Sequence, residues 1–125
     1  MEQTIDTTKW IDLADLSSLI ASMNKPDEKI DAIIDAMLAG PEVVRKLTIK
    51  DLRDAGWIES LPFTAGGAPL RVLLQRRGLK ARTWENDGIV TTSVSDMSGN
   101  SRQANGDNEV VSTLLAIILF ETTKN

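Results

Sequence analysis

The chain of 125 residues contains no cysteine, no histidine and no tyrosine. Without cysteine it has no disulfide and no thiolate nucleophile, and without histidine it lacks the commonest general base and metal ligand. Ser-His-Asp catalysis and zinc sites built on Cys or His are therefore excluded. Carboxylate chemistry remains, but helix starts, polar helix faces and turns explain the positions of the acids. We predict a protein that is not an enzyme and holds no cofactor and no metal.

Long hydrophobic runs are missing as well. The most apolar stretch, Leu114–Phe120, is far shorter than the roughly 20 residues that span a bilayer. Residues 1–10 lack the basic start and the apolar run of a signal peptide. These features predict a cytoplasmic protein with no membrane partner.

Glycine motifs that bind phosphate are absent too. The only double glycine, Gly66-Gly67, is followed by Ala68 and Pro69 rather than by the Lys-Ser/Thr ending of a phosphate loop. The Pro- and Gly-containing segment 62–69 therefore predicts a linker or hinge. With 42% apolar residues, the chain has material for one core. We predict a single domain over residues 1–125, with a helical part (1–61), the linker (62–69) and an α/β part (70–125).

Apolar residues three and four positions apart predict helices in the first part. One helix begins at Asp12, where Asp12 and Asp15 can form a capping pair. A second helix runs from Pro26 to Gly40 and has one continuous apolar face, with Ile34 at its middle.

Shorter helices are predicted to follow. Pro41 can open a third helix over residues 41–47. Thr48 with Asp51 predicts another capping box, starting a helix over 48–56. Pro69 opens a further helix that ends at Gly78.

The hydrophobic period changes to that of strands after Gly78. Residues 79–85 and 89–95 predict two strands, and Asn86-Asp87-Gly88 between them is typical of a tight hairpin turn. Residues 101–104 can form a third strand, and Asp107 or Asn108 caps a last helix. The predicted fold class is α+β: a helical N-terminal half followed by helix–strand–strand–(strand)–helix with a small antiparallel sheet.

Charge is segregated along the chain, whose net charge is −4. Residues 45–82 hold nine Lys or Arg and three acids, whereas acids outnumber bases in 1–44 and in 83–125. This basic segment allows a local anion site or charge-paired contacts between subunits.

One basic cluster is a candidate contact for an anion or for nucleic acid. In a strand over residues 79–85, Lys80, Arg82 and Trp84 share one face, opposite to Leu79, Ala81 and Thr83. Arginines can hold phosphates while an indole stacks on a base. The alternative is an exposed face whose basic stems cover the indole. We call the candidate residues the basic stripe: Arg76, Arg77, Lys80, Arg82 and Trp84.

The last predicted helix is apolar almost all the way round over residues 114–120. Such a helix either lies at the centre of the core or contributes to a subunit interface. Leu115 and Ile118 are the candidate interface residues.

The order of elements resembles that of known families. Helices 48–56 and 69–78 with the hairpin 79–95 are similar to the helix, helix and wing of winged-helix DNA-binding domains. Residues 69–123 are similar in order to double-stranded-RNA-binding domains, whose last helix begins with lysines that grip phosphate. Here those positions read Asn105-Gly106-Asp107-Asn108-Glu109, which argues against RNA binding in that mode. Small α/β accessory proteins of phages share this order without the lysines.

We therefore predict a small non-catalytic accessory protein, encoded by a phage or mobile element, that acts as a protein–protein interaction or assembly module. Its partner is either another protein or a second copy of the chain. The alternative is a winged-helix-like protein that binds nucleic acid through the basic segment 45–82. A nucleotide bound at the basic stripe is a further possibility.

Overall fold

The computed structural model describes residues 10–48, 50–51 and 61–123. Within these residues the chain forms four α-helices and two small antiparallel sheets, so the predicted α+β fold class is confirmed. The elements follow in the order β1 (Trp10–Asp12), α1 (Leu13–Ala21), α2 (Glu28–Leu38), β2 (Lys46–Thr48), a 3-10 helix η1 (Phe63–Ala65), α4 (Ala68–Arg76), β3 (Lys80–Asn86), β4 (Ile89–Ser95), β5 (Ser101–Gly106) and α5 (Glu109–Thr123).

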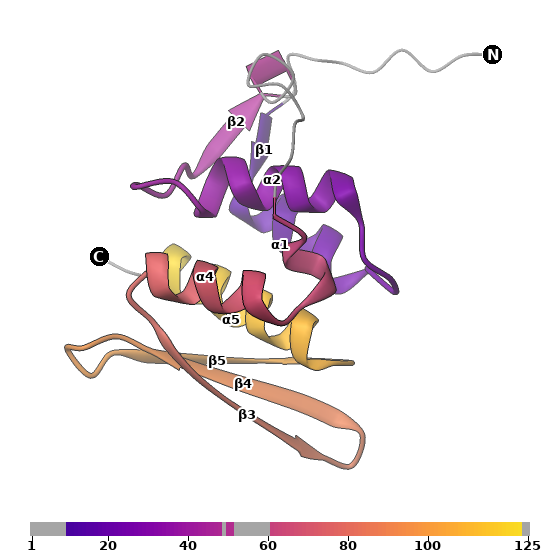
Figure 1. Cartoon of the computed structure of the whole chain (residues 1–125), viewed down its shortest axis with the longest axis vertical. Coiled ribbons are helices and arrows are strands. Elements are labelled where there is room, and N and C mark those ends of the chain that lie inside the picture. Colours follow the sequence, from indigo (N-terminus) through magenta and orange to yellow (C-terminus); the bar gives the residue numbers. More distant parts are fainter. Residues whose placement is uncertain (1–9, 49, 52–60, 124–125) are drawn as a thin grey trace.

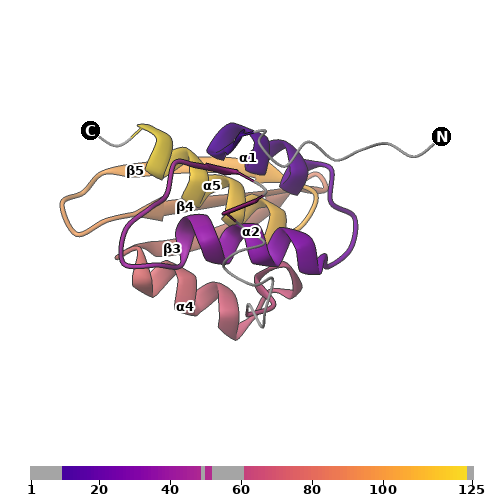
Figure 2. The ribbon, with the colours of Figure 1, turned by 90° about the horizontal axis from the view of Figure 1, so that it is seen from above.

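These elements are stacked in layers (Figure 1). The three-stranded sheet, in the order β3-β4-β5, lies at one end of the molecule. Helices α4 and α5 lie on one side of this sheet, and α1 and α2 lie beyond them. Seen from above, α5 runs over β4 and β5, whereas α4 lies at the β3 side (Figure 2). The opposite side of the sheet is not covered by any of the described elements.

Helix α5 is the central element of the core. It packs against β4 and β5 on one side and against α1 on the other. Its side chains Leu114 and Ile117 are fully buried, as are Leu16 and Ile20 of α1 and Ile34 of α2. The burial of α5 on both sides explains its nearly uniform apolar composition. Among the described residues no helix is long and apolar enough to cross a membrane.

The predicted helix caps are confirmed. The Asp12 carboxylate accepts from the Asp15 backbone N–H at 2.8 Å, and the Asp15 carboxylate accepts from that of Asp12 at 3.0 Å. Thr48 and Asp51 form the same reciprocal arrangement, with distances of 2.9 and 3.0 Å. The backbone N–H of Thr48, its hydroxyl and the charge of Lys50 lower the pKa of Asp51. The rest of the predicted helix 48–56 lies outside the described residues.

The predicted third helix over residues 41–47 is wrong. Residues 46–48 form strand β2, which pairs antiparallel with β1. The backbone N–H of Val44 donates to the carbonyl of Met37 at 2.8 Å, which turns the chain back after α2. Pairing with a strand far away in the sequence has overridden the local helical signal.

The predicted hairpin is confirmed. Asp87 and Gly88 both have positive φ, at 54° and 80°, and Asn86 pairs with Ile89 across them. Two positive φ values are the mark of a type I′ turn, whose twist matches that of the strands. The predicted third strand over residues 101–104 also forms and extends to Gly106.

The segment predicted as a linker or hinge contains two buried residues, Phe63 and Thr64. Phe63 is fully buried, and the Thr64 backbone N–H donates to the Asp31 carboxylate at 2.7 Å. The Thr64 hydroxyl also accepts from the backbone N–H of Asp27 at 2.9 Å. These bonds fasten residues 63–64 to the first turn of α2. The division of the domain at 62–69 stays a prediction.

Candidate functional site

The face of the β3-β4-β5 sheet that points away from α5 is the candidate site, and we call it the outer face. The Thr83 hydroxyl lies 3.0 Å from that of Thr92, which contacts Ser112 of α5 at 2.7 Å. Thr83 therefore points toward the helices. Because side chains alternate along a strand, Lys80, Arg82 and Trp84 lie together on the outer face.

Two exposed apolar side chains stand out on the outer face. Trp84 is 43% exposed and Ile89 is 52% exposed. Trp84 pairs with Thr91, so Ile89 is its diagonal neighbour on the same face, at a typical separation of about 7–8 Å. Together they form an apolar pair near the hairpin end, with Arg82 and Lys80 farther along β3.

The other strand positions of the outer face are uncharged and polar. They are Ser, Thr, Gln and Asn residues of β4 and β5, and Thr91 donates to the Asn105 side chain at 2.7 Å. The strand positions on this face therefore carry two cations and no carboxylate. An exposed Trp beside an Arg and a polar surround is the usual composition of a binding surface.

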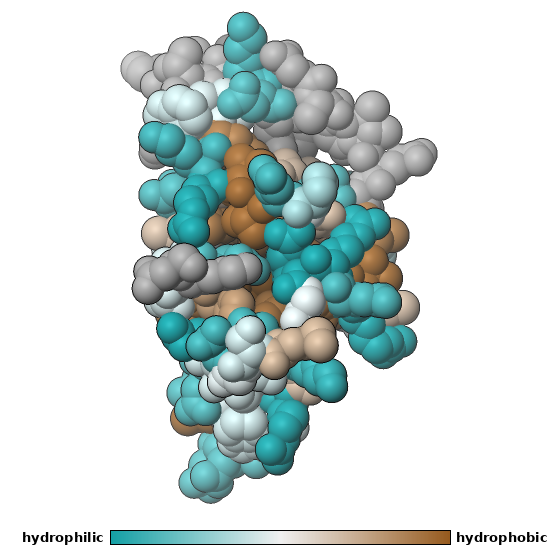
Figure 3. Space-filling view, turned by 90° about the vertical axis from the view of Figure 1, so that its left-hand side faces the viewer, coloured by the Kyte–Doolittle hydropathy of each residue, from teal (hydrophilic) through white to brown (hydrophobic). Residues whose placement is uncertain are grey.

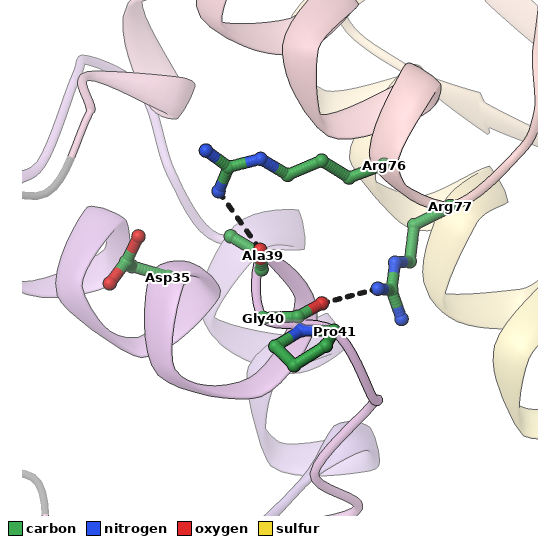
Figure 4. Close-up of a pocket in the computed structure, with 6 residues that line it drawn as sticks. All are labelled: Asp35, Ala39, Gly40, Pro41, Arg76 and Arg77. Carbon is green, nitrogen blue, oxygen red and sulfur yellow. Dashed lines mark hydrogen bonds between the residues drawn. The ribbon is translucent and has the colours of Figure 1, made fainter.

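Arg76 and Arg77 of the basic stripe lie elsewhere, at the C-terminal end of α2 (Figure 4). The Arg76 guanidinium donates to the carbonyl of Ala39 at 2.9 Å, and the Arg77 guanidinium donates to the carbonyl of Gly40. Carbonyls at a helix C-terminus lack partners within the helix and carry partial negative charge. Both arginines thus tie α4 to α2, beside a pocket of about 530 Å³.

Other cations of the basic segment 45–82 are also dispersed. The Lys46 ammonium lies 5.0 Å from the centre of the Trp10 ring, in the two-stranded sheet at the other end of the molecule. The described part of the segment therefore forms several separate sites rather than one basic surface.

The two candidate interface residues of the last helix differ in burial. Ile118 is 2% exposed and is part of the core, while Leu115 is partly buried and packs against it. A side chain enclosed within one chain offers no surface to a second one, so Ile118 is a core residue in this conformation, and a contact of Leu115 with another subunit stays a prediction.

A second surface, on the helical side of β3, is hollowed into a groove of about 780 Å³. Its floor includes Ala81 and Thr83 of β3, and Leu70, Arg71 and Leu74 of α4 line one wall. The Thr83 hydroxyl is part of a buried hydroxyl cluster centred on Thr92, which also contacts Thr113 of α5 at 3.2 Å. The floor of the groove is thus held by hydrogen bonds beneath it.

The side of the molecule shown in Figure 3 is mainly hydrophilic, with a hydrophobic strip in its upper half and smaller hydrophobic areas at mid-height. Among the described residues no group of three or more His, Cys, Asp or Glu is placed to hold a metal ion. Compared with protein-family models, curated proteins and solved structures, the chain matches none of them.

Sequence reasoning found three members of the outer face but missed Ile89. Its place beside Trp84 follows from the Asn86–Ile89 pairing, which the Asn-Asp-Gly signal already fixes. The groove residues of α4 could not be predicted, because the local sequence does not indicate which helix lies beside which strand in the folded domain.

Proposed function

We propose that this chain is a protein–protein interaction module that binds its partner through the outer face. The observation that carries the proposal is the exposed pair Trp84 and Ile89, on a sheet face that none of the described elements covers. Large apolar side chains that stay exposed in a small domain mark binding surfaces when they cluster. Trp is the side chain most enriched among those that dominate binding energy.

The surroundings of this pair support a protein partner. Arg82 can make bidentate hydrogen bonds to carboxylates, and the Ser, Thr, Gln and Asn side chains of β4 and β5 supply a polar rim that excludes water from the centre. The two cations favour a partner surface that carries acids opposite Lys80 and Arg82.

Single-stranded nucleic acid is the second candidate, favoured by the same indole and the same two cations. It differs in its response to salt, because binding to phosphates releases counterions and weakens steeply as salt rises. Only two cations on the outer face limit that electrostatic attraction.

The experiment is a chemically cross-linked pull-down of the full chain from its native host, with recovered proteins and nucleic acids both identified. The double variant Arg82→Ala/Trp84→Ala is compared with Gln103→Ala, which changes an exposed outer-face residue on β5. We expect one protein to be lost with the double variant and kept with Gln103→Ala.

Melting curves keep this comparison interpretable. Replacing an exposed Arg usually changes stability by only about ±0.5 kcal/mol, and removing the half-exposed indole costs somewhat more. Recovery of nucleic acid alone, lost with the double variant, would replace the proposal with the second candidate. If the wild type, the double variant and Gln103→Ala recover the same proteins and nucleic acids in equal amounts, both the protein-binding and the nucleic-acid-binding proposals are wrong.

A further inference from the structure

We infer that the edge of β3 beneath α4 is a second binding site, which takes an extended segment of another protein as an added strand. This site is on the helical side of β3, whereas the proposed interaction surface is the outer face. The two sites share Lys80, but variants at Ala81 and Arg71 test the edge separately from variants at Arg82 and Trp84 on the outer face.

The backbone of β3 is available along its whole length. Among the described residues β3 pairs only with β4, and all of its residues from Lys80 to Asn86 are exposed. In a two-residue turn the residue before the turn bonds to the residue after it, here Asn86 to Ile89. Because bonding alternates along an antiparallel strand, Ala81, Thr83 and Glu85 present their N–H and C=O groups to the open edge.

Helix α4 provides the wall that a strand-binding groove needs. It lies at the β3 side of the sheet when seen from above (Figure 2), and its residues line the same groove as Ala81 and Thr83. A groove between an edge strand and a helix is the arrangement by which several domain types bind extended peptides. The backbone groups of the edge give affinity, and the groove selects alternate side chains.

The lining of the groove indicates which peptide it fits. Leu70, Leu74 and Ala81 form an apolar region that suits an aliphatic side chain. Two cations, Arg71 and Lys80, also line the groove, together with one acid, Glu109 of α5. This excess of positive charge favours a partner segment that carries an aliphatic residue and, on the same face, a carboxylate.

The test selects random heptapeptides displayed on phage against the full chain, immobilised sparsely so that two copies cannot meet. Proline is tolerated on an edge strand where the N–H faces outward, so Ala81→Pro blocks the edge without removing a bond to β4. Ala81→Ser is the matched control, since it keeps the N–H.

We expect selected peptides to contain acidic and aliphatic residues, to bind the wild type and Ala81→Ser, and to lose binding to Ala81→Pro. Arg71→Glu/Lys80→Glu should weaken the acidic peptides by about tenfold or more, whereas Arg82→Ala on the outer face should leave them unchanged. Two sets of N-methylated peptides are compared, one methylated at the odd-numbered and one at the even-numbered backbone nitrogens. Because only every second N–H of an added strand faces the edge, one set should lose binding and the other should keep it.

The N-methylated peptides need no protein variant. They therefore test strand addition even if Ala81→Pro lowers the melting temperature of the protein. The inference is overturned if no peptide distinguishes Ala81→Pro from Ala81→Ser, or if N-methylation has no effect. It is also overturned if the wild type sediments as a dimer that Ala81→Pro dissociates, because the occupant of the edge would then be a second copy.

Discussion

The buried hydroxyl cluster under the sheet gives the sharpest test of the core. The Thr92 hydroxyl lies within hydrogen-bonding distance of three others, at 2.7 Å from Ser112, 3.2 Å from Thr113 and 3.0 Å from Thr83. Thr92 is fully buried, so water cannot replace it. Thr92→Val keeps the shape of the side chain and removes the oxygen that the other hydroxyls share.

The expected cost follows from what those hydroxyls lose. Leaving buried polar groups without a partner costs about 1–3 kcal/mol. Ser112 keeps a bond to the carbonyl of Glu109 at 3.2 Å, and the added methyl group regains up to about 0.8 kcal/mol. The net destabilisation is therefore about 1–2 kcal/mol. For a domain of this size it lowers the melting temperature by about 4–8 °C.

Urea unfolding followed by circular dichroism measures this directly, with the slope m as a check that the unfolded state is unchanged. Thr91→Val is the control: the same chemical change one residue earlier, on the outer face. Its hydroxyl has one partner among the described residues, the exposed side chain of Asn105, which water can satisfy; because Thr91 itself is 9% exposed, we expect a smaller cost than for Thr92→Val, about 0.5–1 kcal/mol.

A double-mutant cycle with Ser112→Ala separates the shared bond from the other effects of each change. The double variant removes both partners, so it should be more stable than the sum of the single effects by about 0.5–1.5 kcal/mol. If Thr92→Val unfolds at the wild-type urea concentration and shows no coupling to Ser112→Ala, then the hydroxyls do not bond to one another and the reasoning fails.

Four further predictions concern the core, the turn and the acid response. Ile34→Asp places a charge in a fully buried site and should leave the chain unfolded or insoluble, whereas a normal melting curve would mean that this face of α2 is exposed. Gly88→Val should cost about 1–2 kcal/mol from the left-handed backbone alone, because a Cβ there meets no atom within 4 Å; Gly88→Asn should recover most of that loss in urea titrations. Ile118→Ala should cost about 2–5 kcal/mol and Leu115→Ala less, with melting temperatures that do not depend on protein concentration; a concentration dependence would return the helix to an interface. Asp51 has a lowered pKa, so its cap contributes stability above the unfolded pKa that is lost as pH falls through the folded one, and an NMR titration of its carboxyl should have a midpoint below 3.8; a midpoint above that value would contradict the cap.

Local signals in the sequence predicted local structure well. The capping pairs Asp12–Asp15 and Thr48–Asp51 connect residues three apart, and the hairpin needs only Asn86-Asp87-Gly88 and the alternation on either side. The common face of Lys80, Arg82 and Trp84 followed from strand alternation alone.

Features that join distant residues were not predictable in the same way. The sequence around Arg76 indicates a surface cation, yet its guanidinium donates to the carbonyl of Ala39, 37 residues earlier in the chain. Strand β1 spans three residues, Trp10–Asp12, and its pairing with β2 leaves no mark on either segment. The edge position of β3 depends on which strands pair, which only the folded sheet decides.

The central place of α5 has a consequence for how the chain is made. Helix α1 emerges early in synthesis, but the helix that covers its apolar face is the last of the described elements along the chain. At about 5–20 residues per second, the ribosome needs about 4–18 s to travel from Ala21 to Glu109. During that interval Leu16 and Ile20 can pack against α2 but not against α5, so part of the apolar face of α1 stays uncovered in the nascent chain. Fragments that stop before residue 109 should accordingly aggregate, whatever the stability of the finished fold.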